Sequence, residues 1–215
     1  MIYDERYAMM HKGYNTYQNT TDICYKIVQF LLDIPYVESG GDFSEVSQTG
    51  CRADLIKYIF YDNANPLACK LPTLEEKKNL IFNPDKPQKP PIKEKGYRIF
   101  AQSKIIDVQT DSKIELRVYP SMITPVDAFM GDLIISFECW SNMDYQQLKS
   151  FQSRTYNMVV CILSALNGRN IAGIGTMFFD KKANAYCNVV SITDNRYNIG
   201  HRLTMGVSIA DEHHG

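Results

Sequence analysis

The stretch that most invites a chemical interpretation in this 215-residue chain is Gly173-Ile174-Gly175, because closely spaced glycines let a backbone approach a phosphate group. A dinucleotide-binding fingerprint also requires a third glycine, a strand before the glycines and a helix that begins at them. Here a helical pattern precedes the glycines and a strand pattern contains them. We therefore interpret the pair as a bulge or a close packing contact within a strand, and we predict no cofactor.

Histidines near carboxylates are the second candidate, since imidazole and carboxylate groups are metal ligands. The residues of this kind are His201, His213 and His214, together with Asp211 and Glu212. Two adjacent histidines near a chain end have no rigid element to hold them, and His11 is isolated. The sequence therefore predicts no metal site.

Catalytic nucleophiles and acids are equally hard to assemble from this sequence. Cys51 stands next to Arg52, which could activate a thiol, but no partner histidine is identifiable, so we interpret Cys51 as structural. Asp107, Asp127 and Asp132 are scattered, and solvated positions in loops and at strand ends are the simpler interpretation. The sequence carries neither a nucleophile-elbow motif nor a zinc-protease motif. We predict that the protein has no catalytic residues and is not an enzyme.

Composition and charge limit the classes of function. The net charge of −1 does not favour nonspecific nucleic-acid binding, which normally requires a basic surface. The hydrophobic fraction of 45% is sufficient for a core. No apolar run approaches the roughly 20 residues that cross a membrane. The polar, acidic start of the chain does not resemble a signal peptide.

Six cysteines complete the inventory of reactive groups: Cys24, Cys51, Cys69, Cys139, Cys161 and Cys187. An even number is compatible with disulfides, but nothing else in the chain is typical of a secreted protein. No pair has the short spacing of a zinc site. We therefore expect buried free thiols of an intracellular protein.

The clearest secondary-structure patterns lie between residues 131 and 209. An alternating strand over 132–140 ends at Trp140, the only tryptophan, which we place at the edge of the core. An apolar stripe at helical spacing predicts one long helix over 146–166, before a turn at Asn167-Gly168. The stripe consists of Leu148, Phe151, Met158, Val159, Ile162, Leu163 and Leu166. Further strands are predicted over 171–179, 185–192 and 202–209.

The first part of the chain alternates helical patterns with loops. Helices are predicted over 23–34, after the N-cap candidates Thr20-Thr21-Asp22, over 52–61 and over 72–78. The proline- and lysine-rich residues 83–95 predict an exposed loop. Strands are predicted over 97–108 and 113–119, joined by a hairpin turn at 111–112, with a loop over 120–130. The Tyr- and Met-rich residues 1–19 are either an arm that orders against a partner or a loose terminus.

Together these patterns predict an α+β fold, in which one long helix packs across a mixed, mostly antiparallel sheet. N-terminal helices and a Pro/Lys-rich loop accompany this sheet. The predicted boundaries are 1–96 for an N-terminal helical extension and insertion, 97–210 for an α+β core and 211–215 for a frayed tail.

Small motifs in the core add a resemblance. They are an Arg-bearing helix from Arg154 to Leu166, Leu166-Asn167-Gly168, Ile171-x-Gly173-x-Gly175, and Tyr197-x-x-Gly200-x-x-Leu203-x-Met205, with Ile114-x-Leu116-x-Val118-Tyr119 upstream. This order of elements and motifs, over about residues 97–210, resembles tail terminator and tail-completion proteins of tailed bacteriophages. The first 96 residues and the lysine-proline loop depart from that family's pattern.

The resemblance implies a virion protein of the phage neck or tail, assembled in the host cytoplasm. It implies a ring, usually a homohexamer, that caps the tail tube and joins it to the head connector or stopper protein. Genomic DNA would pass through the channel without sequence readout, and no membrane is involved. An α+β protomer with exposed sheet edges suits such a ring, because unpaired edges are templates for association.

Three alternatives stay open. Another head–tail connector, a stopper or an adaptor, fits the same pattern of elements. From different classes, the chain could be an enzyme with a small-molecule pocket, or a binding module that uses its Tyr- and Met-rich N-terminus. An enzyme would show a deep pocket with convergent polar groups, and we predict none around Gly173 and Gly175.

Overall fold

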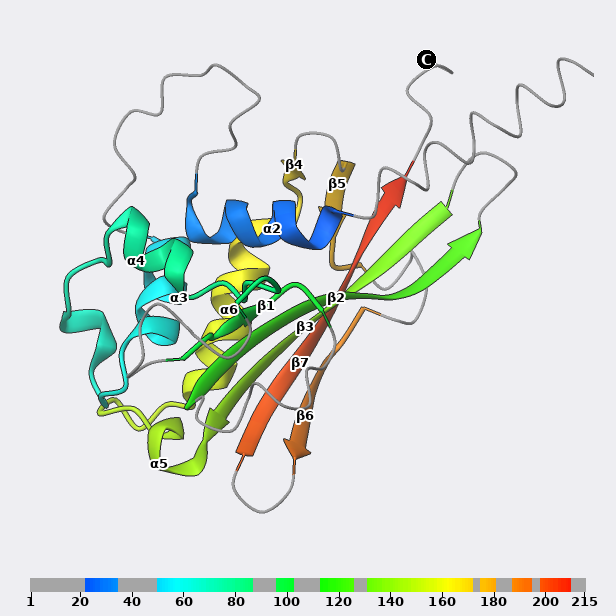
Figure 1. The fold of residues 1–215 in the computed structure, drawn as a ribbon. Helices are drawn as coiled ribbons and strands as arrows, with labels where there is room; N and C mark the ends of the chain where they lie inside the picture. Colours follow the sequence, from blue (N-terminus) through cyan, green and yellow to red (C-terminus); the bar gives the residue numbers. More distant parts are fainter. Residues whose placement is uncertain are drawn as a thin grey trace, which may run out of the picture.

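The computed structural model describes residues 22–34, 50–86, 96–102, 113–125, 131–171, 175–180, 187–194 and 198–209. These residues form a mixed α+β fold, in which helices pack on one face of a curled, mostly antiparallel sheet (Figure 1). The predicted fold class is therefore confirmed. Among the described helices, none is long and apolar enough to cross a membrane.

Three long strands form the centre of the sheet: β2 (Ile114–Pro125), β3 (Gly131–Asn142) and β7 (Asn198–Ile209). β3 pairs antiparallel with β2 on one side and with β7 on the other. The remaining described strands are β1 (Ile99–Phe100), β4 (Asn170–Ile171), β5 (Gly175–Phe178) and β6 (Val189–Asp194). β1 pairs with β2, both β5 and β6 pair with β7, and β4 pairs with β5.

Three helices lie on one face of the sheet: α2 (Ile23–Leu32), α3 (Cys51–Phe60) and α6 (Arg154–Leu166). The predictions of helices over 23–34 and 52–61 are confirmed within two residues at each end. One face of β3, which consists of Leu133, Ile135, Phe137 and Cys139, is buried against these helices. The helices and the strands thus share one hydrophobic core.

Short helical turns complete the described fold: η1 (Pro66–Ala68), α4 (Leu74–Asn79) and α5 (Met143–Gln146). α4 begins with a capping box, because the side chain of Thr73 accepts from the Glu76 N–H while the Glu76 carboxylate accepts from the Thr73 N–H. The predicted capped helix over 72–78 is confirmed in this form.

The prediction of one long helix over 146–166 is wrong. α5 ends at Gln146, and α6 begins only at Arg154, with the Ser153 hydroxyl as its N-cap. Between them Phe151 has a left-handed backbone (φ 61°) and a side chain that is 87% exposed, so it is not part of a buried stripe. A hydrogen bond from the Phe151 N–H to the Leu148 carbonyl (2.9 Å) closes this turn. Apolar spacing alone could not reveal it, because Phe151 happens to fall in phase with α6.

Three strand predictions are wrong in part. Residues 120–130 were expected to form a loop, but β2 continues to Pro125 after a bulge between Pro120 and Met122. A hairpin was expected between 97–108 and 113–119, yet β1 runs parallel to β2, which a direct hairpin does not allow. The stretch 171–179 forms two strands, β4 and β5, that pair antiparallel with each other.

Several predictions fall outside the described residues: the N-terminal segment 1–19, most of the Pro/Lys-rich loop (87–95), the turn at 111–112 and the tail 211–215. The boundary expected between residues 96 and 97 stays a prediction.

Arg98 is a buried side chain that bonds the C-terminal end of α3. Its Nη1 donates to the carbonyl oxygens of Ile59 (2.6 Å) and Phe60 (3.0 Å), and its Nη2 pairs with the Asp62 carboxylate (2.8 Å). The last carbonyls of a helix have no partner within the helix, and their partial negative charge favours a cation. Arg98 therefore joins α3 to the segment that enters β1.

Arg154 also bonds the C-terminal end of α3. It is fully buried, and its guanidinium donates to the carbonyls of Tyr58 (2.8 Å), Tyr61 (3.0 Å), Asn63 (2.5 Å) and Tyr145 (2.7 Å). Burial lowers the pKa of Arg154 to about 10, so the side chain is still charged at neutral pH. Arg154 therefore fixes the first turn of α6 against α3.

Replacement of Arg154 by methionine should strip four carbonyl groups of their donor. We expect the free energy of unfolding to fall by about 3–5 kcal/mol, measured by urea denaturation. Arg169→Met is the control, because Arg169 is an exposed arginine just beyond the same helix and should change stability by less than about 0.5 kcal/mol. A loss below about 1 kcal/mol for Arg154→Met would contradict the role assigned to this side chain.

Leu166→Asp tests the position of α6 on the sheet. Leu166 is fully buried in the core, so an aspartate there should bury an unpaired charge and prevent soluble expression. Ser164→Asp, on the exposed side of the same helix, should express normally. A normal yield and an unchanged circular dichroism spectrum for Leu166→Asp would refute this orientation of the helix.

Candidate functional site

A buried polar network lies on the face of the sheet opposite the helices, and Glu138 is at its centre. One carboxylate oxygen, Oε1, accepts from the Tyr119 hydroxyl (2.6 Å), and the other, Oε2, accepts from Trp140 Nε1 (3.0 Å). Guanidinium groups approach both oxygens, Arg117 at 3.8 Å and Arg202 at 3.9 Å. Each oxygen of Glu138 thus has a donor and a cation, so this carboxylate is held in place rather than presented to a substrate.

Neighbouring side chains extend the same network. Arg117 also forms an ion pair with Glu115 (2.7 Å), and its guanidinium lies 5.3 Å from the centre of the Trp140 ring. Burial, together with the hydrogen bond to Glu138, raises the pKa of Tyr119, which keeps the phenol protonated. The alternation of β2 and β3 assigned these residues to one face, but it could not show that they pair across the two strands. Trp140 is buried in this network and not among the residues of the hydrophobic core, so the prediction that it lies at the edge of the core is not confirmed.

His201 belongs to a second cluster, between α6 and β7. Its Nδ1 lies 2.9 Å from the hydroxyl of Thr155, which itself accepts from Gln146 Nε2 (2.8 Å). The Ser191 hydroxyl is 3.5 Å from the other imidazole nitrogen, Nε2, and the Tyr156 ring packs edge-on against the imidazole. Because Thr155 is fully buried, its hydroxyl cannot reach a substrate. The cluster therefore positions α6 on β7.

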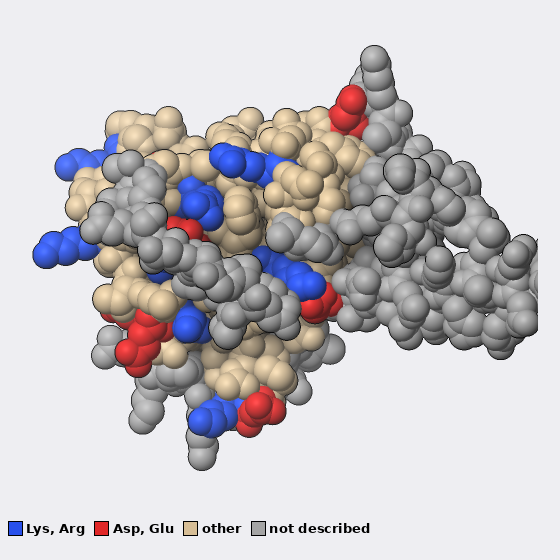
Figure 2. Space-filling view, turned by 90° about the horizontal axis from the view of Figure 1, so that it is seen from above, with Lys and Arg blue, Asp and Glu red and all other residues tan. Residues whose placement is uncertain are grey.

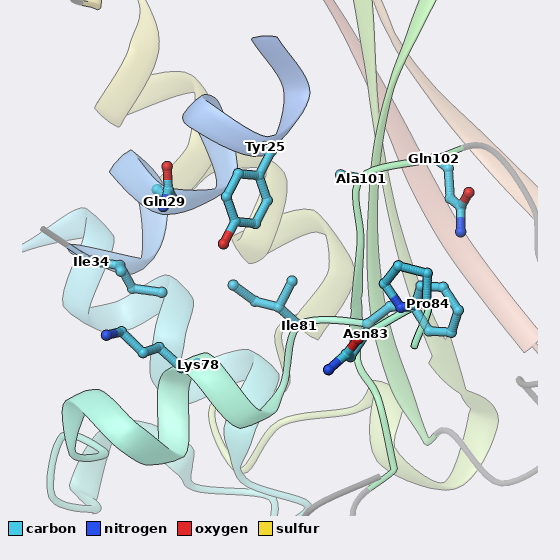
Figure 3. A pocket seen from close by; sticks show the side chains of 10 residues that line it. Tyr25, Gln29, Ile34, Lys78, Ile81, Asn83, Pro84, Ala101 and Gln102 are labelled. Atoms are coloured by element: carbon cyan, nitrogen blue, oxygen red, sulfur yellow. The ribbon is translucent and has the colours of Figure 1, made fainter. Parts of the chain in front are cut away.

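A hollow lies between α2, α4 and the residues around Ile81, and no residue of either cluster lines it (Figure 3). Its volume is about 680 Å³. Tyr25 of α2 and Lys78 of α4 line it together with apolar side chains. Gln29 of α2 is also part of the lining, and its Oε1 is fully buried with no hydrogen-bond partner among the described residues. Neither Gly175 nor Glu138 is among the residues that line this hollow.

Two stretches of strand have an outer side with no partner strand among the described residues. The first, the β2 edge, comprises residues 119–124, because β1 reaches only Leu116 and Arg117 of β2. The second, the β6 edge, comprises residues 189–193, whose only described partner is β7. The β2 edge exposes apolar side chains, since Met122 is 39% and Ile123 is 49% exposed. Unpaired strand edges pair readily with another chain.

The sequence-based candidates are dispersed in the structure. Gly175 opens β5 with φ 110°, a value that favours glycine, while Gly173 lies outside the described residues. Asp132 is buried in β3, which contradicts the expectation of a solvated carboxylate. His11, His213, His214, Asp107, Asp127, Asp211 and Glu212 also lie outside the described residues. Within the described ranges, no three His, Cys, Asp or Glu side chains could share a metal ion.

The cysteines are described in full and all six are free thiols. Cys24 and Cys139 are buried as expected, whereas Cys51, Cys69, Cys161 and Cys187 are only half-buried. Burial raises the pKa of Cys24 and of Cys161 to about 12, so both thiols are protonated at neutral pH. Thiols of this kind are poor nucleophiles.

A comparison with protein families identifies the wider group. A family model described as YomW matches residues 53–207, from α3 to β7, which is more than half of the chain. The chain belongs to the YomW family. This family of phage-like Bacillus proteins of the SPbeta type indicates a phage-associated protein. A search of curated proteins and a search of solved structures each found no match.

The His201 cluster predicts a pH dependence of stability. Burial lowers the pKa of His201 below its ordinary value of about 6.5, so the unfolded chain binds a proton that the folded chain excludes. Stability should therefore decrease as pH falls from about 7 toward the lowered pKa. His201→Gln should flatten this part of the profile, measured by thermal melting between about pH 5 and pH 8. Identical profiles for wild type and variant would show that His201 does not contribute.

Proposed function

We propose that this protein is a structural component of a tailed phage that forms a ring at the end of the tail tube, as a tail terminator. The observation that carries the proposal is the open sheet, whose β2 edge and β6 edge lie on opposite sides and have no partner strand in the described part of the chain. A protomer with two different free edges favours head-to-tail contacts, and such contacts close into a ring when the rotation allows it. The YomW family membership supports the phage setting.

The partners follow from this role. The resemblance of the core to tail terminator proteins favours a homohexamer that contacts the tail-tube protein on one side and the head connector or stopper on the other. Genomic DNA would pass through the ring without sequence readout. Figure 2, which views the molecule from above relative to Figure 1, shows Lys and Arg side chains interspersed with Asp and Glu over the described surface. A mixed surface and a net charge of −1 suit DNA that slides rather than binds.

A structural role also agrees with how the reactive side chains are held. Both oxygens of Glu138 are occupied by donors, the Thr155 hydroxyl is buried, and burial keeps the Cys24 thiol protonated. Groups arranged in this way stabilise a fold and do not turn over a substrate. We therefore propose that the protein is not an enzyme.

The test is the mass of the purified protein, alone and with tail tubes of its phage, followed by electron microscopy. We expect a closed ring whose mass is a multiple of 24.6 kDa and which sits at the end of the tube. Rings that bind the head connector and ignore the tube would instead show a stopper or an adaptor. A strictly monomeric protein, even with tail tubes present, would overturn the proposal.

A further inference from the structure

We propose that the β6 edge of one copy pairs antiparallel with the β2 edge of the next copy, so that one continuous sheet runs around the ring. This inference rests on the ring of the proposed function and specifies the contact that builds it. The partner is thus a second copy of this chain, and the contact is a strand-to-strand seam.

The directions of the strands permit this seam. β2, β3, β7 and β6 are each antiparallel to the next, so β6 runs opposite to β2. In copies related by rotation about the ring axis, equivalent strands run in the same direction along that axis. When β6 of one copy meets β2 of the next, the two strands are therefore antiparallel, which is the pairing that already joins these four strands.

The shapes of the two sides are complementary. On one side, β1 occupies the half of β2 around Leu116, and only residues 119–124 remain unpaired. On the other side, β5 occupies β7 at Gly206 and Val207, and β6 occupies the half between Asn198 and Leu203. The free stretches thus lie at diagonally opposite corners of the sheet. When they meet, β1 of one copy falls beyond the end of β6 of its neighbour, and the two do not collide.

The offset between the two edges agrees with a closed barrel. Both edges can be located by their positions along β3. Ser191 of the β6 edge pairs with His201, which pairs with Cys139 of β3, whereas Met122 of the β2 edge pairs with Ile134 of β3. The two edges are therefore offset by five residues along β3. At about 3.4 Å per residue this offset is about 17 Å, and four strands at about 4.8 Å span about 19 Å. If neighbouring copies are displaced by about 17 Å along the strands for every 19 Å across them, the strands tilt by roughly 40° from the ring axis, which is within the range of closed barrels.

The hand of the offset decides which face is outside. In a strand that runs upward with its side chain toward the viewer, an L-residue directs its N–H to the viewer's right. The Leu116 side chain faces the helices, and its N–H donates to the Arg98 carbonyl beside β1. Viewed from the helices with β2 upward, β1 is therefore at the right and β6 at the left.

Strands of a closed barrel rise to the right when seen from outside, because of their right-handed twist. With this slope, the right edge of one copy meets the left edge of its neighbour at a point that lies lower on the neighbour's own strands. The right edge must therefore be free at its upper end, and the left edge at its lower end. The β2 edge is the upper one and the β6 edge the lower one, so the helices must lie on the outside of the ring. The face with Glu138 then points toward the ring axis.

The backbone of both edges fits the same geometry. Ser191 lies opposite His201 on the helix side, so its N–H points away from β7 and into the seam. Ile123, opposite Leu133, likewise directs its N–H away from β3. Pro120 occupies an equivalent outward position, where a residue without an N–H leaves the β2–β3 ladder intact.

The experiment uses proline substitutions that remove one outward N–H and spare the pairing within the protomer. Ser191→Pro should disable the β6 edge, and Ile123→Pro should disable the β2 edge. Each variant alone should lose the ring and sediment at the protomer mass of 24.6 kDa. A 1:1 mixture should form complexes of two chains and no more at high concentration, because it retains one intact pair of edges. Sedimentation velocity and circular dichroism are measured on the same samples.

Lysine variants test the seam without a change of backbone. Ile123→Lys should abolish the ring, whereas Leu67→Lys, on an exposed residue of η1 (41% exposed, against 49% for Ile123), should leave it unchanged. If either proline variant has lost its native circular dichroism spectrum, the comparison of Ile123→Lys with Leu67→Lys decides whether the seam exists. A wild-type ring that survives Ser191→Pro, Ile123→Pro and Ile123→Lys in natively folded protein would overturn this seam and leave the ring itself standing. A wild-type chain that forms no ring would overturn the proposed function instead.

Discussion

The carbonyl groups at the C-terminal end of α3 impose the constraint on which much of the structure depends. They are buried between the helices and the sheet, so water cannot serve as their donor, and an unpaired buried carbonyl costs about 1–3 kcal/mol. Two arginines supply the donors from distant parts of the chain, Arg98 at the entry to β1 and Arg154 at the start of α6. Neither arginine can move without exposing several carbonyl groups to an apolar environment. The end of one helix therefore fixes two other elements at once.

This constraint leads directly to the open edges of the sheet. Because Arg98 is bonded to the end of α3, β1 is held beside the half of β2 around Leu116 and Arg117, where it runs parallel to β2. The other half of β2 is left without a neighbour in the described part of the chain. On the opposite side, the positions of β5 and β6 along β7 leave β6 outermost over the other half of the sheet. The diagonal arrangement of free edges is thus a result of packing around α3.

The sequence shows which side of a helix or strand is buried, but it does not show which distant residues that element contacts. Period-two patterns located β3 and β7, and apolar spacing located α2 and α3, because these signals depend only on which side of an element is buried. The break before Arg154 escaped prediction because Phe151 falls in phase with the apolar residues of α6. The parallel course of β1 escaped because it depends on hydrogen bonds from Arg98 to residues more than 35 positions away. The Glu138 network escaped for a related reason. The alternating pattern shows which residues share a face of one strand, but it does not show that polar side chains of β2, β3 and β7 bond one another.

The free energies of seam formation and of association indicate how a ring built on these edges must behave. The β2 edge directs about three backbone groups outward, the C=O of Pro120 and the N–H and C=O of Ile123, because alternate residues face β3. Three hydrogen bonds contribute roughly 1.5–4.5 kcal/mol at about 0.5–1.5 kcal/mol each. Association of two proteins costs about 4–15 kcal/mol in lost freedom of motion, so a single seam is marginal. Burial of exposed apolar side chains on the β2 edge, such as Met122 and Ile123, adds to it. A closed ring contains one more seam than an open chain of the same copies, and the last seam forms without a further loss of freedom. Closure is therefore strongly favoured over short open oligomers, and a surface that aligns the copies, as a tail tube would, promotes it further.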